Sequence, residues 1–347
     1  MEFSDYIDDV VQGEDVPENP PISIVIPPSF RGQRIDKALG SLIDDYSRSK
    51  IQQWLQSGLV QSAGEPLLPK YTVLGNEQIL IAVPSDPQNM AYQPEDIPLQ
   101  IVFSDASIAI IHKPVGLVVH PAVGNWGKTL LNAVLHHFPE CSLVPRAGIV
   151  HRLDKDTSGL LVIAKNLIAQ NALVKQLQER SMQRRYLALV WGRAPMTKEI
   201  DQPIGRDPHH RLKMAISSGS SSKEARTRMQ CLDQITYRDK VISLVECQLE
   251  TGRTHQIRVH LESIGHPLVN DPMYRSKVPI QIDQFLREEM QHHAIQIPGQ
   301  ILHARLLGLC HPQSLKNVSW QIDPAQAFID LFKLLGISTA SWQQLVK

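Results

Sequence analysis

The sequence of 347 residues contains few cysteines, few aromatic side chains and no long apolar run. The four cysteines (Cys141, Cys231, Cys247 and Cys310) lie far apart and form no CxxC pair, which excludes a disulfide scaffold and a zinc ribbon. This cysteine usage is typical of a reducing compartment, so we expect a cytoplasmic protein. No apolar run approaches the roughly 20 residues that a membrane-spanning helix needs, and we therefore expect no membrane partner.

Basic residues are missing from the first 21 positions, which hold seven carboxylates. A segment without Lys, Arg or a long apolar stretch is neither a signal peptide nor an Arg-rich transit peptide. We predict that residues 1–24 form an acidic disordered tail. The remaining 28 acidic residues against 35 basic ones give residues 22–347 a net charge of +7, although the whole chain sums to zero. A basic folded part permits a polyanionic partner.

Proline, aspartate and asparagine accumulate without periodicity in residues 85–98, where we predict an interdomain linker. The preceding residues, 25–84, combine two segments with apolar residues at helical spacing, 34–43 and 47–58, with two short strand-like segments. We predict a small α/β domain there.

The pattern changes after the linker, where short strand-like segments alternate with helix-like ones. Strand composition occurs at residues 99–105, 107–113, 159–165, 185–192, 241–250 and 256–261. Helical spacing occurs at residues 129–138, 168–179 and 324–336. Residues 99–347 are therefore predicted to form one α+β domain, in which a mixed, mainly antiparallel sheet carries flanking helices.

Two common kinds of site fit the sequence poorly. GNWGKTL, residues 124–130, resembles the end of a phosphate-binding P-loop, but Ala122 occupies the position of its first glycine. Histidines are numerous, yet no HExxH pair occurs. His255 and His260 are five residues apart, and on a strand their rings point to opposite faces. We expect neither a nucleotide ligand nor a metal site.

Residues 151–159, HRLDKDTSG, place five ionisable side chains directly before the apolar run LLVIA. Two interpretations are open at this point: a solvated turn, or a site in which one carboxylate does chemistry. Arg152 and Asp154 are two residues apart, so on an extended backbone their side chains point to the same side. Asp156 is predicted to cap the turn at Thr157.

Four motifs follow one another along the chain. They are HKPVGLVVHP, GIVHRLDKDTSGLLVIAK, RRYLALVWG and LETGRTHQIRVHLESIGHPLVNDP. Together they closely resemble the large-ribosomal-subunit RNA pseudouridine synthases, and the resemblance extends over residues 25–320. The chain departs from the family at Asn270 and Arg275, where glycines are usual, and at Arg185, where an acid or a lysine is common.

The resemblance implies an isomerase that converts uridine to pseudouridine without a cofactor or a metal. It places the nucleophilic carboxylate at Asp154 and a paired arginine at Arg258. At Tyr186 it places a ring that stacks on the uracil and takes its C5 proton, and Arg152 is implied to assist in flipping the base. We assign three further residues to substrate binding: His151, Lys113 and His120.

Basic side chains cluster in the first domain, on the segments RIDKAL and SRSKIQQWLQSG. These segments resemble the S4 RNA-binding domain, although Ser-Ala-Gly and Gly-Asn stand where the family has Val-Asn-Gly and Gly-Asp turns. The helix start at Ser47 suits a phosphate group, and the alternative is a solvated basic face. We assign five residues to RNA binding: Arg34, Lys37, Ser47, Arg48 and Lys50.

The leading hypothesis is pseudouridine formation in large-subunit ribosomal RNA by a monomer. Its partner is that RNA or the pre-ribosomal large subunit, and two basic segments, 205–215 and 217–228, are predicted to contact RNA phosphates. The alternative is a non-catalytic RNA-binding assembly factor that carries an S4 domain. A P-loop nucleotide hydrolase comes third because of Ala122.

Overall fold

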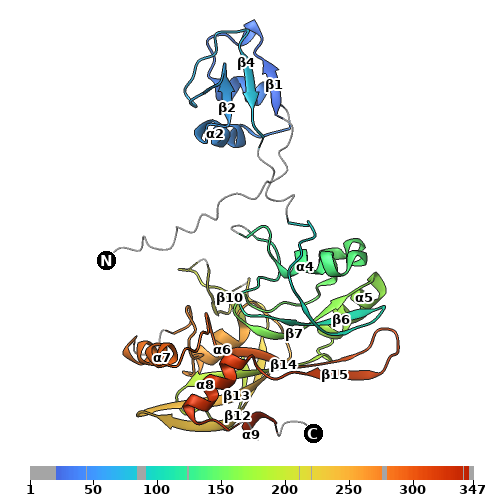
Figure 1. Ribbon diagram of the computed structural model, residues 1–347, viewed down its shortest axis with the longest axis vertical. Coiled ribbons are helices and arrows are strands. Elements are labelled where there is room, and N and C mark those ends of the chain that lie inside the picture. Colours follow the sequence, from blue (N-terminus) through green and yellow to red (C-terminus); the bar gives the residue numbers. More distant parts are fainter. Residues whose placement is uncertain are drawn as a thin grey trace. The chain divides into compact units, whose positions relative to one another are not determined.

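The computed structural model describes residues 21–43, 45–83, 91–122, 125–210, 212–219, 221–275, 280–338 and 340–343. The chain divides into two compact units, Met1–Asn89 and Met90–Lys347 (Figure 1), which we call the smaller and the larger unit. Residues 1–20 of the predicted tail and the first part of the predicted linker lie outside the described residues.

The smaller unit contains a four-stranded sheet in the order β1-β4-β2-β3. Its strands and helices are β1 (Ile22–Val25), α1 (Ile35–Leu42), α2 (Arg48–Gln56), β2 (Val60–Ser62), β3 (Glu65–Pro66) and β4 (Gln78–Ile81). The predicted tail ends too late, because the alternating sequence ISIV already pairs with β4 as strand β1.

Helix α2 forms where the sequence predicts it. The Ser47 hydroxyl accepts a hydrogen bond from the Lys50 N–H at 3.3 Å and so caps the helix. Ile51, Trp54 and Leu55 are buried on one face of the helix, where they join the apolar core between helices and sheet. The N-cap and this apolar face together explain why a nine-residue segment is helical.

The larger unit is built on one large sheet in the order β5-β6-β7-β14-β8-β13-β12-β9, with β15 paired to β14. The strands are β5 (Gln100–Ser104), β6 (Ile108–Lys113), β7 (Ser158–Ala164), β8 (Gln183–Trp191), β9 (Thr197–Asp201), β12 (Arg226–Tyr237), β13 (Lys240–Leu249), β14 (Leu302–Cys310) and β15 (Asn317–Gln321). Only the pairing of β7 with β14 is parallel among the described strands of this sheet. The predicted mixed, mainly antiparallel α+β sheet is therefore confirmed.

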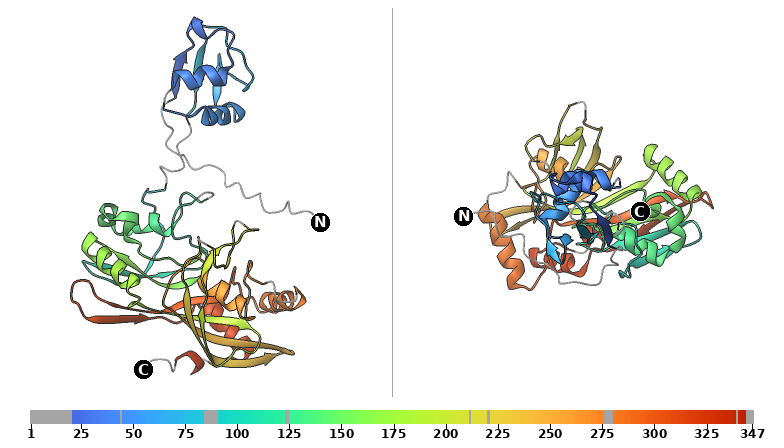
Figure 2. Two further views of the ribbon diagram at one scale, coloured as in Figure 1. Left: turned by 180° about the vertical axis from the view of Figure 1, so that it is seen from behind. Right: turned by 90° about the horizontal axis from the view of Figure 1, so that it is seen from above.

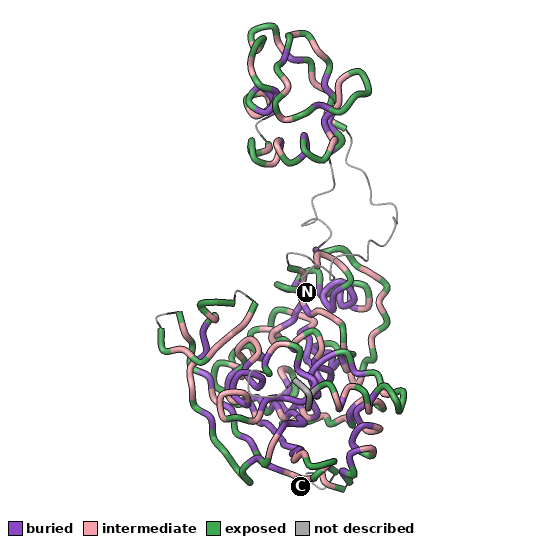
Figure 3. Tube along the Cα trace, turned by 90° about the vertical axis from the view of Figure 1, so that its left-hand side faces the viewer, coloured by how far each residue is buried: buried purple, intermediate pink, exposed green. Residues whose placement is uncertain are grey.

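Helices cover both faces of this sheet (Figures 1 and 2). They are α4 (Leu130–His137), α5 (Leu167–Gln178), α6 (Gln256–Ser263), α7 (Ile280–His292), α8 (Gln326–Leu335) and α9 (Ala340–Gln343). One face packs against α4 and α6, whereas the other packs against α7, α8 and α9 near β8 and against α5 near β6. The buried residues of the larger unit concentrate in its interior (Figure 3). No described helix is long and apolar enough to cross a membrane.

A small hairpin of β10 (Ile204–Arg206) and β11 (Met214–Ile216) projects from the large sheet's edge strands and carries most of the predicted basic segment 205–215. The second half of the predicted linker belongs to the larger unit. The Asn132 side chain at the start of α4 donates to the Gln93 carbonyl at 2.8 Å, and the Glu95 N–H donates to the Asn132 carbonyl at 3.1 Å.

The packing of strand β7 explains why the segment HRLDKDTSG ends in a glycine, Gly159. Every residue of β7 is buried, and Gly159 lies directly against Ala304 of β14 with φ of +118°. A β-carbon on Gly159 would stand 2.3 Å from the Ala304 carbonyl oxygen, so no larger residue fits there without moving a strand. This close contact between β7 and β14 fixes the start of β7, and so the position of the turn that precedes this strand.

The strand predicted at residues 256–261 is wrong, because this segment is helix α6. Its apolar residues occur at every second position, as in a strand. Ile257 and Leu261, one turn apart, pack into the main core, whereas Val259 packs on the other side against Tyr274. A helix buried on two sides carries apolar residues all round and loses the 3.6-residue period.

Candidate active site

Asp154 lies on the segment between the turn at Gly148 and strand β7. The turn that follows it is closed by the backbone, because the Thr157 N–H donates to the Asp154 carbonyl at 3.1 Å. The Asp154 side chain keeps 15% of its surface exposed and reaches a cleft of about 560 Å³. A carboxylate in this position is held at a fixed place and is still open to a ligand.

Arg258 on α6 is the cation beside Asp154, as the resemblance implies. Its NH1 group donates to Asp154 Oδ2 at 3.2 Å. The other two donors form a closer fork to a second carboxylate, Asp271, with Nε to Oδ2 at 2.7 Å and NH2 to Oδ1 at 2.9 Å. One guanidinium therefore joins two carboxylates, and its stronger bidentate contact goes to Asp271.

Asp271 and Tyr274 hold the Arg258 side chain in place. Asp271 is 1% exposed, and its Oδ1 also accepts the N–H groups of Met273 at 2.8 Å and Tyr274 at 2.9 Å. The guanidinium carbon stands 4.8 Å from the centre of the Tyr274 ring, a favourable cation–π distance. Burial alone would lower the pKa of Arg258, but Asp271 and Asp154 outweigh burial and raise it.

The sequence reasoning did not identify Asp271 and Tyr274 as part of the site. Both lie in NDPMY, where Asp271 directly follows the departure at Asn270 and Tyr274 directly precedes the one at Arg275. Asn270 has φ of +59° and donates to the carbonyls of Ile297 and Gly299, so it fills the position that the family gives to glycine. The signal that could have found Asp271 is a carboxylate two residues after the apolar pair Leu268 and Val269.

Tyr186 on β8 lies on the same face of the sheet as Asp154 and is 5% exposed. Both residues line the cleft and a small adjoining cavity of about 40 Å³ that Arg258 also lines. Burial raises the pKa of Tyr186 to about 12, with the charge of Arg184 opposing the shift and that of Asp154 adding to it. Tyr186 is therefore a neutral phenol near pH 7, which favours stacking on a base over accepting a proton.

Arg152 and His151 also line this cleft. Arg152 is exposed, as a side chain that enters RNA must be. The His151 Nε2 accepts the Val162 N–H at 3.2 Å. Burial, together with the charge of Arg184, lowers the pKa of His151 to about 3, so its ring is neutral and supports the middle of β7.

Lys113, assigned to substrate binding by sequence, has a different role in the structure. It is fully buried, and its ammonium donates to the carbonyls of Pro114 at 2.7 Å, Leu117 at 2.9 Å and Lys155 at 2.9 Å. Burial lowers its pKa to about 7, against the opposing charges of Asp156 and Asp154. All three donors are used on carbonyls, so Lys113 fixes the turn of HRLDKD and has no donor left for a substrate.

His120 is not among the residues that line the cleft, but it contacts Arg146, which is. Its Nε2 lies 2.7 Å from the Arg146 NH2, and Arg146 lines the cleft. Burial and the charges of Arg146 and Arg152 lower the pKa of His120 to about 4. A neutral ring of this kind can accept a hydrogen bond from Arg146 and so orient it.

The cleft is strongly cationic, and we call it the arginine cleft. Its lining includes one carboxylate of the site, one tyrosine and five arginines: Asp154, Tyr186, Arg146, Arg152, Arg180, Arg184 and Arg253. The other carboxylate on its wall, Glu250, is paired with Arg226 at 3.3 Å and Arg228 at 2.9 Å. Such a concentration of positive charge suits a polyanion.

Two of the predicted RNA-binding residues of the smaller unit, Arg34 and Arg48, are held by a buried carboxylate that the sequence did not indicate. Asp36 is 0% exposed and accepts from Arg34 Nε at 3.0 Å, Arg48 NH2 at 2.8 Å and Gln52 Nε2 at 2.6 Å. Burial acts to raise the pKa of Asp36, but these three donors together lower it. Arg34 and Arg48 remain half exposed, and Lys37 is exposed.

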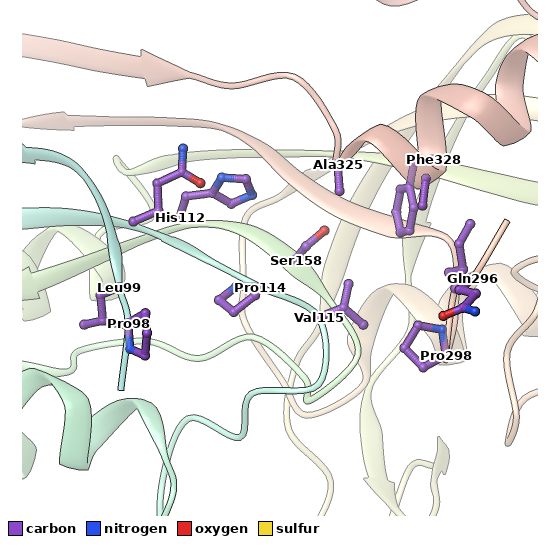
Figure 4. Close-up of a pocket in the computed structure, with 13 residues that line it drawn as sticks. Pro98, Leu99, His112, Pro114, Val115, Ser158, Gln296, Pro298, Ala325 and Phe328 are labelled. Carbon is purple, nitrogen blue, oxygen red and sulfur yellow. The ribbon is translucent and has the colours of Figure 1, made fainter. Parts of the chain in front are cut away.

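Neither a metal nor an apolar ligand is indicated at the arginine cleft. Within the described ranges, no group of three His, Cys, Asp or Glu residues could hold a metal ion. A separate pocket of about 580 Å³ is lined mainly by apolar side chains such as Pro98, Val115 and Phe328 (Figure 4), and it shares no lining residue with the cleft. Its chemistry does not suit RNA.

Comparison with known proteins agrees with this arrangement. Over residues 107–263 the chain matches the family described as RNA pseudouridylate synthase, a span that contains Asp154, Tyr186 and Arg258. In solved structures, the human protein "RNA Pseudouridylate Synthase Domain Containing 4" is 24% identical, with a TM-score of 0.50, over 68% of this chain and 92% of that one. That likeness concerns the fold, and it is the fold of a pseudouridylate synthase domain.

Curated relatives extend over nearly the whole chain. A Neisseria meningitidis protein named "Ribosomal large subunit pseudouridine synthase D" is 43% identical over 337 residues, covering 96% of this chain and 86% of the relative. A protein of the same name from Nitrosomonas europaea is 46% identical over 302 residues, covering 86% and 83%. The chain therefore belongs to the RNA pseudouridine synthase family.

Proposed function

We propose that the protein converts uridine to pseudouridine in large-subunit ribosomal RNA, with Asp154 as the nucleophile. The observation that carries the proposal is the position of Asp154, a partly exposed carboxylate tied to Arg258 on the wall of a cationic cleft. The names of the Neisseria and Nitrosomonas relatives supply the substrate class.

The reaction breaks the bond between uracil N1 and ribose C1′ and joins C1′ to uracil C5, whose proton leaves. Nothing is oxidised or reduced, so the protein has to supply a nucleophile, a place for the detached base and a path for one proton. An ionised carboxylate can form the covalent intermediate that holds the substrate while the base turns. Arg258 holds one oxygen of Asp154 in place and makes no contact with its second oxygen.

The target uridine must leave its stack to reach Asp154, at a cost of a few kcal/mol. Arg152 is exposed two residues before Asp154, which places it where it can occupy the gap in the RNA. Tyr186 offers the flipped base an aromatic face, and stacking of this kind contributes about 1–3 kcal/mol per base. These two contacts offset the cost of flipping.

The direct test is the release of tritium from ribosomal RNA labelled at uridine C5. Wild type is expected to release tritium in a time-dependent manner, because the C5 proton is lost when the new carbon–carbon bond forms. Mapping of pseudouridines in ribosomal RNA from cells with and without the protein then identifies the position. Absence of both release and any lost pseudouridine would overturn the proposal.

RNA binding is expected to weaken steeply with salt if the basic face of the smaller unit contacts phosphates. Replacing Lys37 and Lys50 by Gln is expected to lower the slope of log affinity against log salt by about one per residue. Replacing Lys316 and Lys333 together by Gln, an equal charge change on two exposed residues of the larger unit, serves as the control. A slope that the double variant leaves unchanged would remove the smaller unit from the RNA interface.

A further inference from the structure

Arg184, the second residue of β8, is a buried cation on the wall of the arginine cleft. It is 5% exposed. Its one hydrogen bond to a described residue is from NH2 to the Glu250 backbone carbonyl at 3.2 Å. Its Nε has no partner, and no carboxylate of the described chain lies within ion-pair distance of it. Arg258 in the same region, by contrast, has two carboxylates.

A guanidinium in this environment is costly to the free protein. Removing a charge from water costs several kcal/mol unless an opposite charge or a full set of hydrogen bonds replaces the water. Burial lowers the pKa of Arg184, and nearby Arg253 adds to the shift. Arg253 itself donates from its Nε to the Glu224 carbonyl at 2.9 Å. Among the described residues, the side chains of these two neighbouring cations donate hydrogen bonds to backbone carbonyls and to no carboxylate.

The fold leaves room for Arg184 at this position. A β-carbon on Gly252 would stand 2.7 Å from the Arg184 NH1, so glycine at this position is what lets the guanidinium lie against the cleft wall. The positive charge of Arg184 acts to lower the pKa of both His151 and Tyr186. The side chain is therefore directed toward the groups that surround Asp154.

The spacing between Arg184 and Tyr186 matches one nucleotide. They are two residues apart on β8 and share a face of the strand, which separates their β-carbons by about 7 Å. A base that stacks on Tyr186, with its ribose at Asp154, carries its own phosphates at a comparable distance from the ring. An anion at Arg184 and Arg253 would supply the negative charge that this wall lacks.

We propose that Arg184, assisted by Arg253, binds a backbone phosphate adjacent to the flipped uridine, so that phosphate, ribose and base are held at Arg184, Asp154 and Tyr186. This inference rests on the proposed function and names the phosphate contact of that same site. A phosphate fits better than a uracil carbonyl, because the carbonyl carries no charge to compensate the guanidinium.

The test combines a protein change with an RNA change. In an RNA fragment that wild type modifies, each of the two phosphates flanking the target uridine is replaced in turn by a neutral methylphosphonate. One replacement is expected to slow single-turnover tritium release by wild type tenfold to a hundredfold. On normal RNA, the single-turnover rate of Arg184→Gln is expected to be lower than that of wild type by a similar factor. On that modified RNA, the rate of Arg184→Gln is expected to fall little further.

The controls separate this contact from other effects. Arg193→Gln removes a charge from an exposed arginine bonded to Gln234 and is expected to remain as sensitive to the methylphosphonate as wild type. Arg184→Lys keeps a charge at the site and is expected to recover part of the rate and of the sensitivity. The melting temperature of Arg184→Gln without RNA is expected to equal or exceed that of wild type, because an uncompensated charge is removed.

Additive losses from Arg184→Gln and from each methylphosphonate would overturn the inference, because independent losses mean that the two groups do not interact. Should the Gln variant fail to fold, Arg184→Met removes the same charge and keeps an unbranched side chain, and additive losses in that variant have the same meaning. Failure of the proposed function is distinguishable, since wild type itself would then release no tritium from any RNA.

Discussion

Asp154→Asn is expected to abolish tritium release, with a loss of at least roughly 10⁴-fold in the single-turnover rate. An amide has nearly the same shape as the carboxylate but cannot form the covalent bond to the substrate. A non-catalytic RNA-binding factor predicts the opposite, namely normal function in cells with this variant. Activity of Asp154→Asn equal to wild type would eliminate Asp154 as the nucleophile.

Asp154→Asn is expected to leave the fold intact, because Arg258 still has one carboxylate partner. Arg258 keeps its bidentate contact with Asp271, so the buried pair stays neutral after Asp154 loses its charge. RNA affinity is expected to hold or to increase, because one negative charge leaves the arginine cleft. Thermal melting and RNA titration of Asp154→Asn check these two expectations, and Asp156→Asn, two residues away, serves as the matched control for activity.

The two central residues of the site were predictable because each lies in a sequence motif that the family resemblance links to the reaction. HRLD and HQIR identified Asp154 and Arg258, and the structure places their side chains 3.2 Å apart although 104 residues separate them. The element that carries Arg258 was not predictable from alternation, because a helix buried on two sides imitates a strand.

The residues that support the site were not predictable, because their roles depend on contacts distant in sequence. Lys113 reads as a lysine at the end of a strand that could contact substrate, but its role is set by three carbonyls that converge only in the fold. Asp36 reads as part of a charged helix face, yet two arginines and a glutamine enclose it. Burial of a charged group is a property of the packed structure, and a single sequence does not express it.

The pKa of Tyr186 bears on the proton path. Burial raises that pKa to about 12, so at neutral pH the phenol would have to lose its own proton before it could accept the one from C5. Stacking makes no such demand and needs only the ring. The raised pKa therefore favours the stacking role over the proton-accepting role that the resemblance also implies for Tyr186.

Asp271→Asn is expected to be the most damaging change outside the cleft. The amide cannot accept both donors of the Arg258 fork, and its NH₂ group faces either that fork or the N–H groups of Met273 and Tyr274. Breaking a buried ion pair costs roughly 3–5 kcal/mol, which corresponds to a fall in melting temperature of roughly 6–20 °C for a unit of this size. Asp330→Asn on α8 provides a control away from the site.

Loss of activity in Asp271→Asn is expected even well below its melting temperature, by roughly 10²-fold in the single-turnover rate, because a displaced Arg258 misplaces the nucleophile. RNA affinity is expected to stay close to that of wild type, since Asp271 is buried and touches no cleft wall. A loss in rate without a loss in affinity separates positioning of Asp154 from general damage to the fold. If the variant melts early but retains the wild-type rate at low temperature, Arg258 is positioned by Tyr274 and the backbone, and Asp271 contributes stability alone.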